Sequence, residues 1–151
     1  MKTWDLDETK RHIRRLYGDE QLKLTISPLQ SIGERQYYAR FHFRHAEALL
    51  KTFLGLKEES GMFNTLMLEV GAHLTACIQS MHAVADILAH SVYYSLGENL
   101  QPNPLAHDKI NLYSVANRMT SASELKKLEK LLGQIATGGE FRHLSALSNR
   151  A

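Results

Sequence analysis

The sequence predicts an all-α fold, an antiparallel up-and-down bundle of five or six helices around one long central helix. The main observation is an apolar segment without helix breakers at residues 62–96, whose apolar residues recur in steps of three and four. Segments with the same spacing precede and follow it, joined by short connections. With 151 residues and 44% hydrophobic content, the chain fits a single domain over residues 1–151.

Composition narrows the classes of partner and location. The formal net charge of +2 is too small to indicate nucleic acid by itself, so no DNA partner is expected and any RNA contact must come from a local patch. The single cysteine, Cys77, excludes an intramolecular disulfide and is expected to be a buried thiol. The N-terminus lacks a secretory signal, and charged residues interrupt 62–96 too often for a membrane span. We expect a cytoplasmic protein with no cofactor and no membrane partner.

The first segment predicts a short helix followed by a connection. Thr3 or Asp5 can cap the helix, and Gly18 ends it. Leucine and isoleucine then alternate with polar residues up to Pro28, which is compatible with a short strand or an extended connection. A lone strand has no partner, so we predict a connection.

Residues 34–57 predict a second helix that packs antiparallel to the central one. Arg40, Arg44, Glu47 and Lys51 form its outward face, on which Glu47 and Lys51 are spaced for an ion pair. A tight connection at 57–61 leads into the central helix. The predicted inward face consists of Tyr38, Phe41, His45, Ala48, Leu49, Thr52, Phe53 and Leu56.

The central helix carries two stripes of different chemistry. Small residues between them would let neighbouring backbones approach closely, so that only the polar stripe need face water. The apolar stripe consists of Phe63, Leu66, Val70, Leu74, Cys77, Met81, Val84, Leu88 and Val92. The polar stripe consists of Thr75, Gln79, His82, Asp86, His90 and Tyr93.

After a loop at 97–104, the chain predicts three further helices. Residues 108–119 form the first, with Ile110, Tyr113, Ala116 and Met119 inward. Residues 121–124 have capping-box spacing before the second, which ends at the glycines 138–139. The last apolar face consists of Phe141, Leu144 and Leu147.

The polar stripe is the first candidate for chemistry. His82, Asp86 and His90 follow one another at four-residue spacing, and such a set can bind a divalent metal or exchange protons. However, His82 and His90 lie roughly 12 Å apart along a helix, and no recognised ligand spacing is present, so no metal site is expected. We interpret the stripe as a polar seam between helices. No exposed-serine elbow or phosphate-binding glycine loop occurs either.

Three short runs, QSMHAVADIL at 79–88, EFRHL at 140–144 and SNR at 148–150, resemble the HEPN superfamily, nearest to uncharacterised bacterial members. The resemblance implies a helical bundle that is typically dimeric. It also implies a metal-independent ribonuclease, or an RNA-binding relative, of toxin-antitoxin or antiviral systems. The superfamily's active site contains an arginine and a later histidine with four to six residues between them.

The sequence departs from that motif at its end. Asn149 and Arg150 look like its start and are the candidate catalytic residues, but the sequence ends at Ala151 without the histidine. We therefore expect a truncated chain without nuclease activity. The pairs Arg40/His45 and Arg35/His42 have the required spacing but lie on an early helix, where the superfamily does not place its motif. The residues expected to contact RNA are Arg142, His143, Asn149 and Arg150.

Three hypotheses for function follow. The first is a HEPN-like protein that binds RNA, or a degenerate or truncated ribonuclease, for which no enzymatic activity of this polypeptide is expected. The second is a non-enzymatic helical module that forms a homodimer through its long helices. The third is a metal- or proton-handling enzyme that uses His82, Asp86 and His90.

Overall fold

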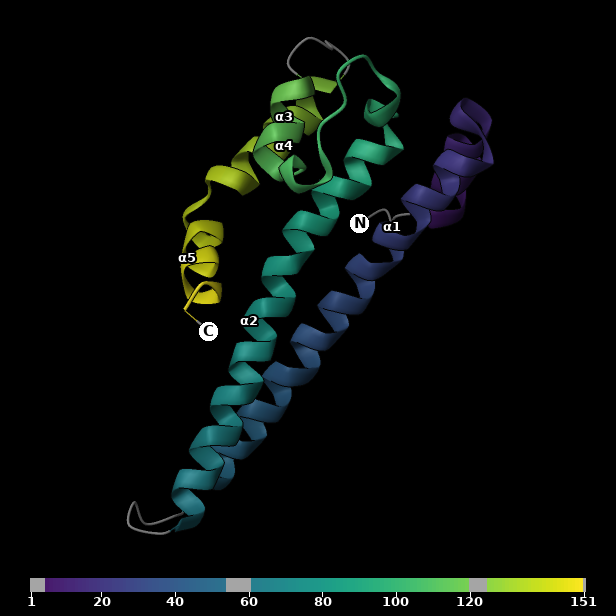
Figure 1. Ribbon diagram of the computed structural model, residues 1–151. Coiled ribbons are helices and arrows are strands. Elements are labelled where there is room, and N and C mark those ends of the chain that lie inside the picture. Colours follow the sequence, from purple (N-terminus) through teal and green to yellow (C-terminus); the bar gives the residue numbers. More distant parts are fainter. Residues whose placement is uncertain (1–4, 54–60, 120–124, 151) are drawn as a thin grey trace. The chain divides into compact units, whose positions relative to one another are not determined.

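The computed structural model describes residues 5–53, 61–119 and 125–150, and every regular element in these ranges is helical. This confirms the all-α prediction. The order, shown in Figure 1, is α1 (Leu6–Phe53), α2 (Gly61–Ser95), the 3₁₀ turns η1 (Glu98–Leu100) and η2 (His107–Lys109), α3 (Leu112–Arg118), α4 (Lys126–Thr137) and α5 (Gly139–Ser148). The chain divides into two compact units. The first is Met1–Ile32 with Ala85–Gly138, and the second is Gly33–Val84 with Gly139–Ala151.

Helix α1 begins where the sequence predicts, but at Gly18, the predicted end, it is kinked and continues. The Asp5 side chain accepts a hydrogen bond from the Glu8 backbone N–H at 2.9 Å, as an N-cap does. Gly18 has φ of 86°, in the left-handed region that glycine tolerates, and interrupts the helical backbone. The predicted stop at Gly18 is therefore a kink between two helical segments.

The segment after Gly18 is helical, and the predicted extended connection is wrong. Leu22, Thr25 and Leu29 are buried on one helical face, where the two leucines cluster with Ile13. Burying each large apolar side chain contributes roughly 1.5–3 kcal/mol, which together outweighs the roughly 3 kcal/mol that Pro28 costs inside a helix. The alternation of apolar and polar residues after Gly18 suggested an extended segment. It does not mark one buried face, because Leu22 is buried and Leu24 is exposed.

In the second unit, α1 and α2 pack along a narrow seam. Ala39 and Ala46 are buried on α1, and Val70 and Ser80 on α2. The two helices run in opposite directions here, since His42 meets His73 while Tyr38 and Gln79 line one hollow. Figure 1 shows this pair as the blue part of α1 beside the teal part of α2. We call it the helix pair.

The predicted inward face of residues 34–57 is wrong. Tyr38, Phe41, His45, Ala48 and Thr52 are all exposed, and only Leu49 is half-buried. Small side chains at the seam let the two backbones approach closely, which turns the aromatic stripe away from α2. The Phe53 side chain, Leu56 and the connection at 57–60 lie outside the described residues. The predicted ion pair between Glu47 and Lys51 is present at 3.0 Å.

Helix α2 matches the predicted central helix to within one residue at each end. Its stripes are less cleanly separated than predicted. Leu74 and Met81 of the apolar stripe are exposed, whereas Tyr93 of the polar stripe is 1% exposed. The Tyr93 hydroxyl accepts a hydrogen bond from the Leu105 backbone N–H at 2.8 Å, so this polar group is satisfied by the protein.

Helix α3 starts at Leu112, later than predicted, because Asn111 and Ser114 form a capping box there. Of the four residues predicted to face inward, Ala116 in α3 and Ile110 and Met119 just outside its two ends are buried, but Tyr113 is exposed. The helix packs on α4, and Gly138 caps the end of α4 as predicted. The capping box predicted at 121–124 lies outside the described residues.

Long-range hydrogen bonds fasten α1 to the turn after α2 within the first unit. The Tyr17 hydroxyl donates to the Leu96 carbonyl at 2.9 Å. The Gln21 amide donates to the Tyr94 carbonyl at 2.5 Å and pairs with the Asn99 side chain. Between these contacts Gly97 adopts a left-handed conformation, with φ of 67°. Among the described residues, we find no helix with the length and apolarity that a membrane crossing requires.

Candidate functional site

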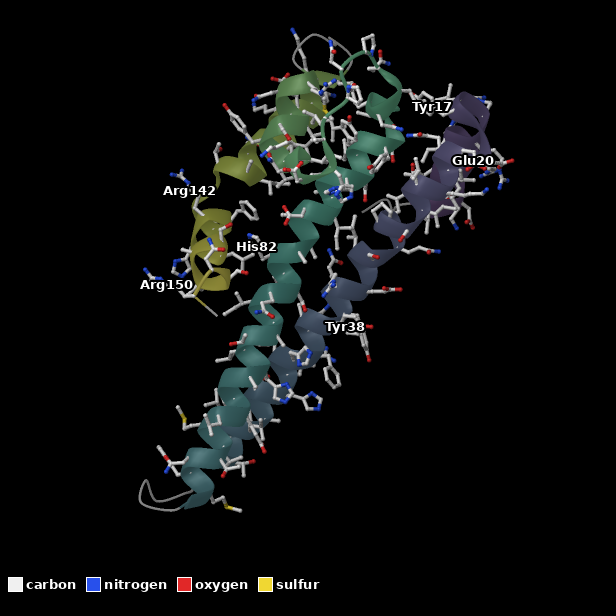
Figure 2. The ribbon with its side chains drawn as sticks, in the orientation of Figure 1. Tyr17, Glu20, Tyr38, His82, Arg142 and Arg150 are labelled. Atoms are coloured by element: carbon white, nitrogen blue, oxygen red, sulfur yellow. The ribbon has the colours of Figure 1, made fainter. Side chains whose placement is uncertain are left out.

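The residues predicted to contact RNA lie on and just after α5. Arg142 and His143 are exposed on the helix, and Asn149 and Arg150 form an exposed turn at its end. Figure 2 shows Arg142 and Arg150 at the two ends of this segment. The structure therefore presents these basic groups to solvent as a short surface strip.

His82 of the polar stripe fastens α5 to α2. Its Nε2 atom lies 3.0 Å from the Ser145 hydroxyl. Its ring stacks on Phe141, with centroids 5.7 Å apart and planes only 4° from parallel. In Figure 2 the His82 side chain points from α2 toward α5. This pair of contacts gives His82 a structural role in this position.

The structure does not gather the rest of the polar stripe into one site. The Asp86 side chain is exposed, while its carbonyl accepts a hydrogen bond from His90 Nδ1 at 2.9 Å. The His90 ring lies 4.7 Å from that of His107, and its Nε2 atom is buried without a hydrogen-bond partner among the described residues. In residues 5–53, 61–119 and 125–150, no group of three or more potential ligands is arranged to hold a metal ion.

A different cluster stands out on the helix pair, where aromatic and basic side chains alternate along one exposed side of α1. Tyr37 is 63% exposed and Phe41 41% exposed, and their rings lie 6.4 Å apart and 24° from parallel. The Arg40 Nε donates to the Gln36 carbonyl at 3.2 Å, which orients its guanidinium. We call this surface the aromatic–arginine face. It consists of Arg35, Tyr37, Tyr38, Arg40, Phe41, Arg44 and His45.

Two hollows lie on this surface. The larger, of about 400 Å³, is lined by Tyr37, Arg40, Phe41, Arg44 and His45. The second, of about 330 Å³, is lined by Arg35, Tyr38, His42, Ala76, Gln79 and Ser80. Both are open to solvent and combine flat rings with guanidinium groups, so they suit a ligand with planar and anionic parts.

Three histidine rings from α1 and α2 contact one another at the edge of this face. His42 Nδ1 lies 2.9 Å from His73 Nδ1. The His45 and His73 rings stack, with centroids 5.3 Å apart. His45 Nδ1 donates to the Phe41 carbonyl at 3.1 Å, which leaves its Nε2 atom as the free ring nitrogen. These contacts fix the orientation of the three rings.

Charge on this part of the helix pair is biased toward the positive. Arg35, Arg40 and Arg44 belong to the face, while the carboxylates on the same segments are Glu34 and Glu69 near it and Glu47, which pairs with Lys51. Arginine binds phosphate through a planar fork of donors, and aromatic rings offer stacking platforms for bases. The face therefore combines groups that can contact an anion with rings on which a flat ligand can stack.

Reasoning from the sequence missed this face because it assigned Tyr38, Phe41 and His45 to the core. A signal was present in the run RQYYARFHFRH at 35–45, where aromatic and basic residues interleave. Arg40 and His45, which have the spacing of the superfamily motif, line the same hollow. No protein-family model, curated protein or solved structure matches this chain.

Proposed function

We propose that the protein is a non-catalytic, HEPN-like RNA-binding module that holds single-stranded RNA on the aromatic–arginine face. The observation that carries this proposal is the exposure of Tyr37, Tyr38 and Phe41 beside three arginines on one side of one helix. Large aromatic side chains are usually buried, so their display in water requires a reason. Stacking of RNA bases on these rings would explain their exposure.

The mode of binding follows from the two kinds of side chain. Tyr37 and Phe41 stack unpaired bases, each contributing roughly 1–3 kcal/mol whatever the base. Arg40 and Arg44 contact phosphates, which makes the affinity salt-dependent. RNA is also the ligand that the sequence suggests, but we now assign the main contacts to α1 and not to α5. Arg142, His143, Asn149 and Arg150 then act as an auxiliary strip on α5.

Fluorescence anisotropy with a labelled 12-nucleotide single-stranded RNA tests the proposal at 50 and 200 mM salt. Tyr37→Ala and Phe41→Ala should each weaken binding roughly 5- to 160-fold. The double variant Arg40→Gln/Arg44→Gln should make the negative slope of log K against log salt shallower by about 1.4, since each single-strand phosphate contact contributes roughly −0.7.

A matched control removes the same charge elsewhere. Arg11 and Arg15 line another surface hollow on α1, with Glu8 and His12 and without aromatic residues, so Arg11→Gln/Arg15→Gln should leave the affinity nearly unchanged. If both double variants lost RNA affinity equally, binding would depend on overall charge and not on this face, which would contradict the proposal. The absence of RNA binding at 50 mM salt would contradict it too. Equal affinity for DNA of the same sequence would remove RNA as the specific ligand. Intact RNA on a gel after binding is expected for a non-catalytic module.

A second candidate function, the homodimeric helical module, is favoured by a separate observation. Besides the aromatic–arginine face, the helix pair exposes Phe43, Leu50, Met62, Met67, Leu68, Leu74 and Met81. Exposed apolar side chains in such number are typical of protein interfaces. We propose that the protein is a homodimer through its long helices, and sedimentation should show a mass of two chains. This candidate is compatible with RNA binding by the aromatic–arginine face.

A further inference from the structure

The second hollow of the helix pair is lined by polar groups that the proposed stacking of bases does not use. It is formed by both helices and has a volume of about 330 Å³. Among the described residues that line it none is acidic, and all but an alanine carry hydrogen-bonding groups. Figure 2 labels one of them, Tyr38. The lining consists of Arg35, Tyr38 and His42 from α1 and Ala76, Gln79 and Ser80 from α2.

Ser80 is the most deeply buried residue of this lining, at 6% exposed. Other buried hydroxyls of the protein donate to a backbone carbonyl one helical turn earlier, as Thr25 does at 2.8 Å and Ser91 at 2.7 Å. The Ser80 hydroxyl has no hydrogen-bond partner among the described residues. A buried hydroxyl needs such a partner, and a ligand in the hollow would provide one.

Two further side chains of the hollow have unused donors. Arg35 and Gln79 are exposed, and neither makes a hydrogen bond or an ion pair with any residue that the structure describes. In contrast, the Arg40 Nε donates to the Gln36 carbonyl. Arg35 brings a positive charge and a planar fork of donors from α1, and Gln79 brings an amide N–H from α2. Donors on both helices can therefore contact one ligand.

His42 contributes a fourth group, which its contact with His73 orients. The Nδ1 atoms of the two rings lie 2.9 Å apart, so the nitrogen that His42 can offer to a ligand is Nε2. When His73 donates the shared proton, neutral His42 carries its own proton on Nε2 and is a donor. An anion in the hollow favours this arrangement of the two protons.

Four donor groups around one hollow indicate an anion with several free oxygens. A phosphodiester within a strand has two free oxygens and one charge, and the strand must enter and leave on either side of it. A terminal phosphate monoester has three free oxygens and a charge of roughly −1.5 to −2 at pH 7. It also enters a hollow end-on. The terminal monoester therefore matches the number of donors and the shape of the hollow better.

The second hollow adjoins the larger hollow of the aromatic–arginine face. Tyr37 lines the larger hollow and Tyr38 the second, and their ring centroids lie 6.1 Å apart. Phe41 and His42, again one from each hollow, have ring centroids 5.3 Å apart. A nucleotide joins a flat base to a phosphate within one short unit, so a single strand end can occupy both hollows.

We infer that the second hollow binds the terminal phosphate monoester of an RNA strand, while the adjoining base stacks in the larger hollow. This inference rests on the proposed RNA binding and adds a preference for a strand end. Arg35 and His42 hold the phosphate from α1. Ser80 and Gln79 donate to it from α2. A 5′-phosphate and a 3′-phosphate share this chemistry, and RNAs that carry one or the other distinguish the two ends.

RNAs that differ only at their ends test the inference on the unmodified chain. Three unlabelled 12-nucleotide RNAs of one sequence carry a 5′-phosphate, a 3′-phosphate or no terminal phosphate. Each competes with an internally labelled RNA in fluorescence anisotropy at 200 mM salt and pH 7.5. At least one phosphorylated RNA should bind about 10-fold tighter than the unphosphorylated RNA, because hydrogen bonds to a charged group are strong. The RNA that gains affinity identifies the bound end.

Two single variants test whether the second hollow holds the phosphate. Ser80→Ala removes only a hydroxyl, and Arg35→Gln removes the positive charge. Each should lower the ratio of the dissociation constants for unphosphorylated and phosphorylated RNA about 5-fold. Ser91→Ala replaces a buried serine of the same helix outside the hollow, and Arg15→Gln replaces an exposed arginine of another hollow. These matched controls should leave the ratio unchanged.

The possible outcomes separate this inference from the proposed function. Equal binding of all three RNAs overturns the terminal-phosphate site and leaves RNA binding by the aromatic–arginine face intact. A preference for phosphorylated RNA that persists in both Ser80→Ala and Arg35→Gln places the phosphate elsewhere and overturns the assignment of the second hollow. An equal fall of the ratio in the controls contradicts it as well. If none of the RNAs binds, the inference and the proposed function fail together.

Discussion

The Nδ1 atoms of His42 and His73 lie 2.9 Å apart across the seam between α1 and α2. At this distance one ring donates its Nδ1 proton and the other accepts it. The two side chains are 31 residues apart in sequence, and their contact shows in which register α1 and α2 pack. It is therefore a test of whether the helix pair is assembled as described.

A double-mutant cycle on this histidine pair should reveal coupling. His42→Phe and His73→Phe each leave one half-buried ring nitrogen without its partner and should lower the free energy of unfolding by about 1–2 kcal/mol. The double variant should lose less than the sum, with a coupling energy of about 1 kcal/mol from urea denaturation. Strict additivity would show that the two rings do not interact.

Gly97 should be intolerant of any side chain. Its φ of 67° disfavours other residues by roughly 1–2 kcal/mol. A Cβ atom there would also lie 2.7 Å from the Tyr17 ring. Gly97→Ala should therefore lower the free energy of unfolding by about 2–3 kcal/mol, and by about 1 kcal/mol less in a Tyr17→Ala background. An equal effect in both backgrounds would remove the contact with Tyr17 from the explanation.

Replacing Gly133 should have the opposite effect on the free energy of unfolding. It lies inside α4 with ordinary helical φ, and a Cβ atom there would meet nothing within 4 Å. Gly133→Ala should raise the free energy of unfolding by roughly 0.5–1 kcal/mol because alanine restricts the unfolded chain and favours a helix. Thermal unfolding followed by circular dichroism measures both glycine variants under the same conditions.

The contacts of His82 should control the local stability of α5. His82→Ala removes both the hydrogen bond to Ser145 and the ring stack on Phe141. Amide hydrogen exchange in Gly139–Ser148 should accelerate roughly 10-fold, while the buried residues of α3 keep their protection. The exposed His143→Ala serves as the control and should leave exchange unchanged. Unaltered exchange in His82→Ala would place the attachment of α5 elsewhere.

Partial burial raises the pKa of the Cys77 thiol above its ordinary value of 9.0. The folded protein therefore keeps the thiol protonated to higher pH than the unfolded chain does. Alkylation by iodoacetamide at pH 8.5 should be at least about 3-fold slower in the folded protein than in 8 M urea, since the thiolate is the nucleophile. By linkage, the free energy of unfolding should decline slightly as pH rises above 9. Equal alkylation rates at pH 8.5 would contradict the raised pKa.

The features predictable from sequence are those that local chemistry decides. The bounds of α2, the cap at Asp5, the break at Gly18 and the end of α4 at Gly138 each depend on a few neighbouring residues. A long apolar segment without breakers has little alternative to a helix, and glycine ends helices for steric reasons alone. The all-α class follows from these local decisions.

The face of α1 that packs on α2 could not be predicted from the sequence of α1 alone. Two stripes on this helix have the same three- and four-residue spacing, one containing Phe41 and the other Ala39 and Ala46. Hydrophobicity favours the aromatic stripe for the core. The choice is made by packing against α2, since Ala39 and Ala46 are buried in the helix pair while Phe41 is exposed. That fit is a property of the pair of helices, so neither helix reveals it alone. Because the aromatic stripe was assigned to the core, the sequence did not predict the aromatic–arginine face.

The exposure of Tyr37 and Phe41 on the aromatic–arginine face has a consequence for valency in the proposed homodimer. Two copies of the chain carry two such faces, so one dimer offers two sites to RNA. A short RNA then occupies one face, while a long RNA contacts two faces or bridges one dimer to the next. Apparent affinity should rise steeply with RNA length through local concentration, without any additional contact per binding face. The protein would gather long transcripts into networks and leave short fragments dispersed.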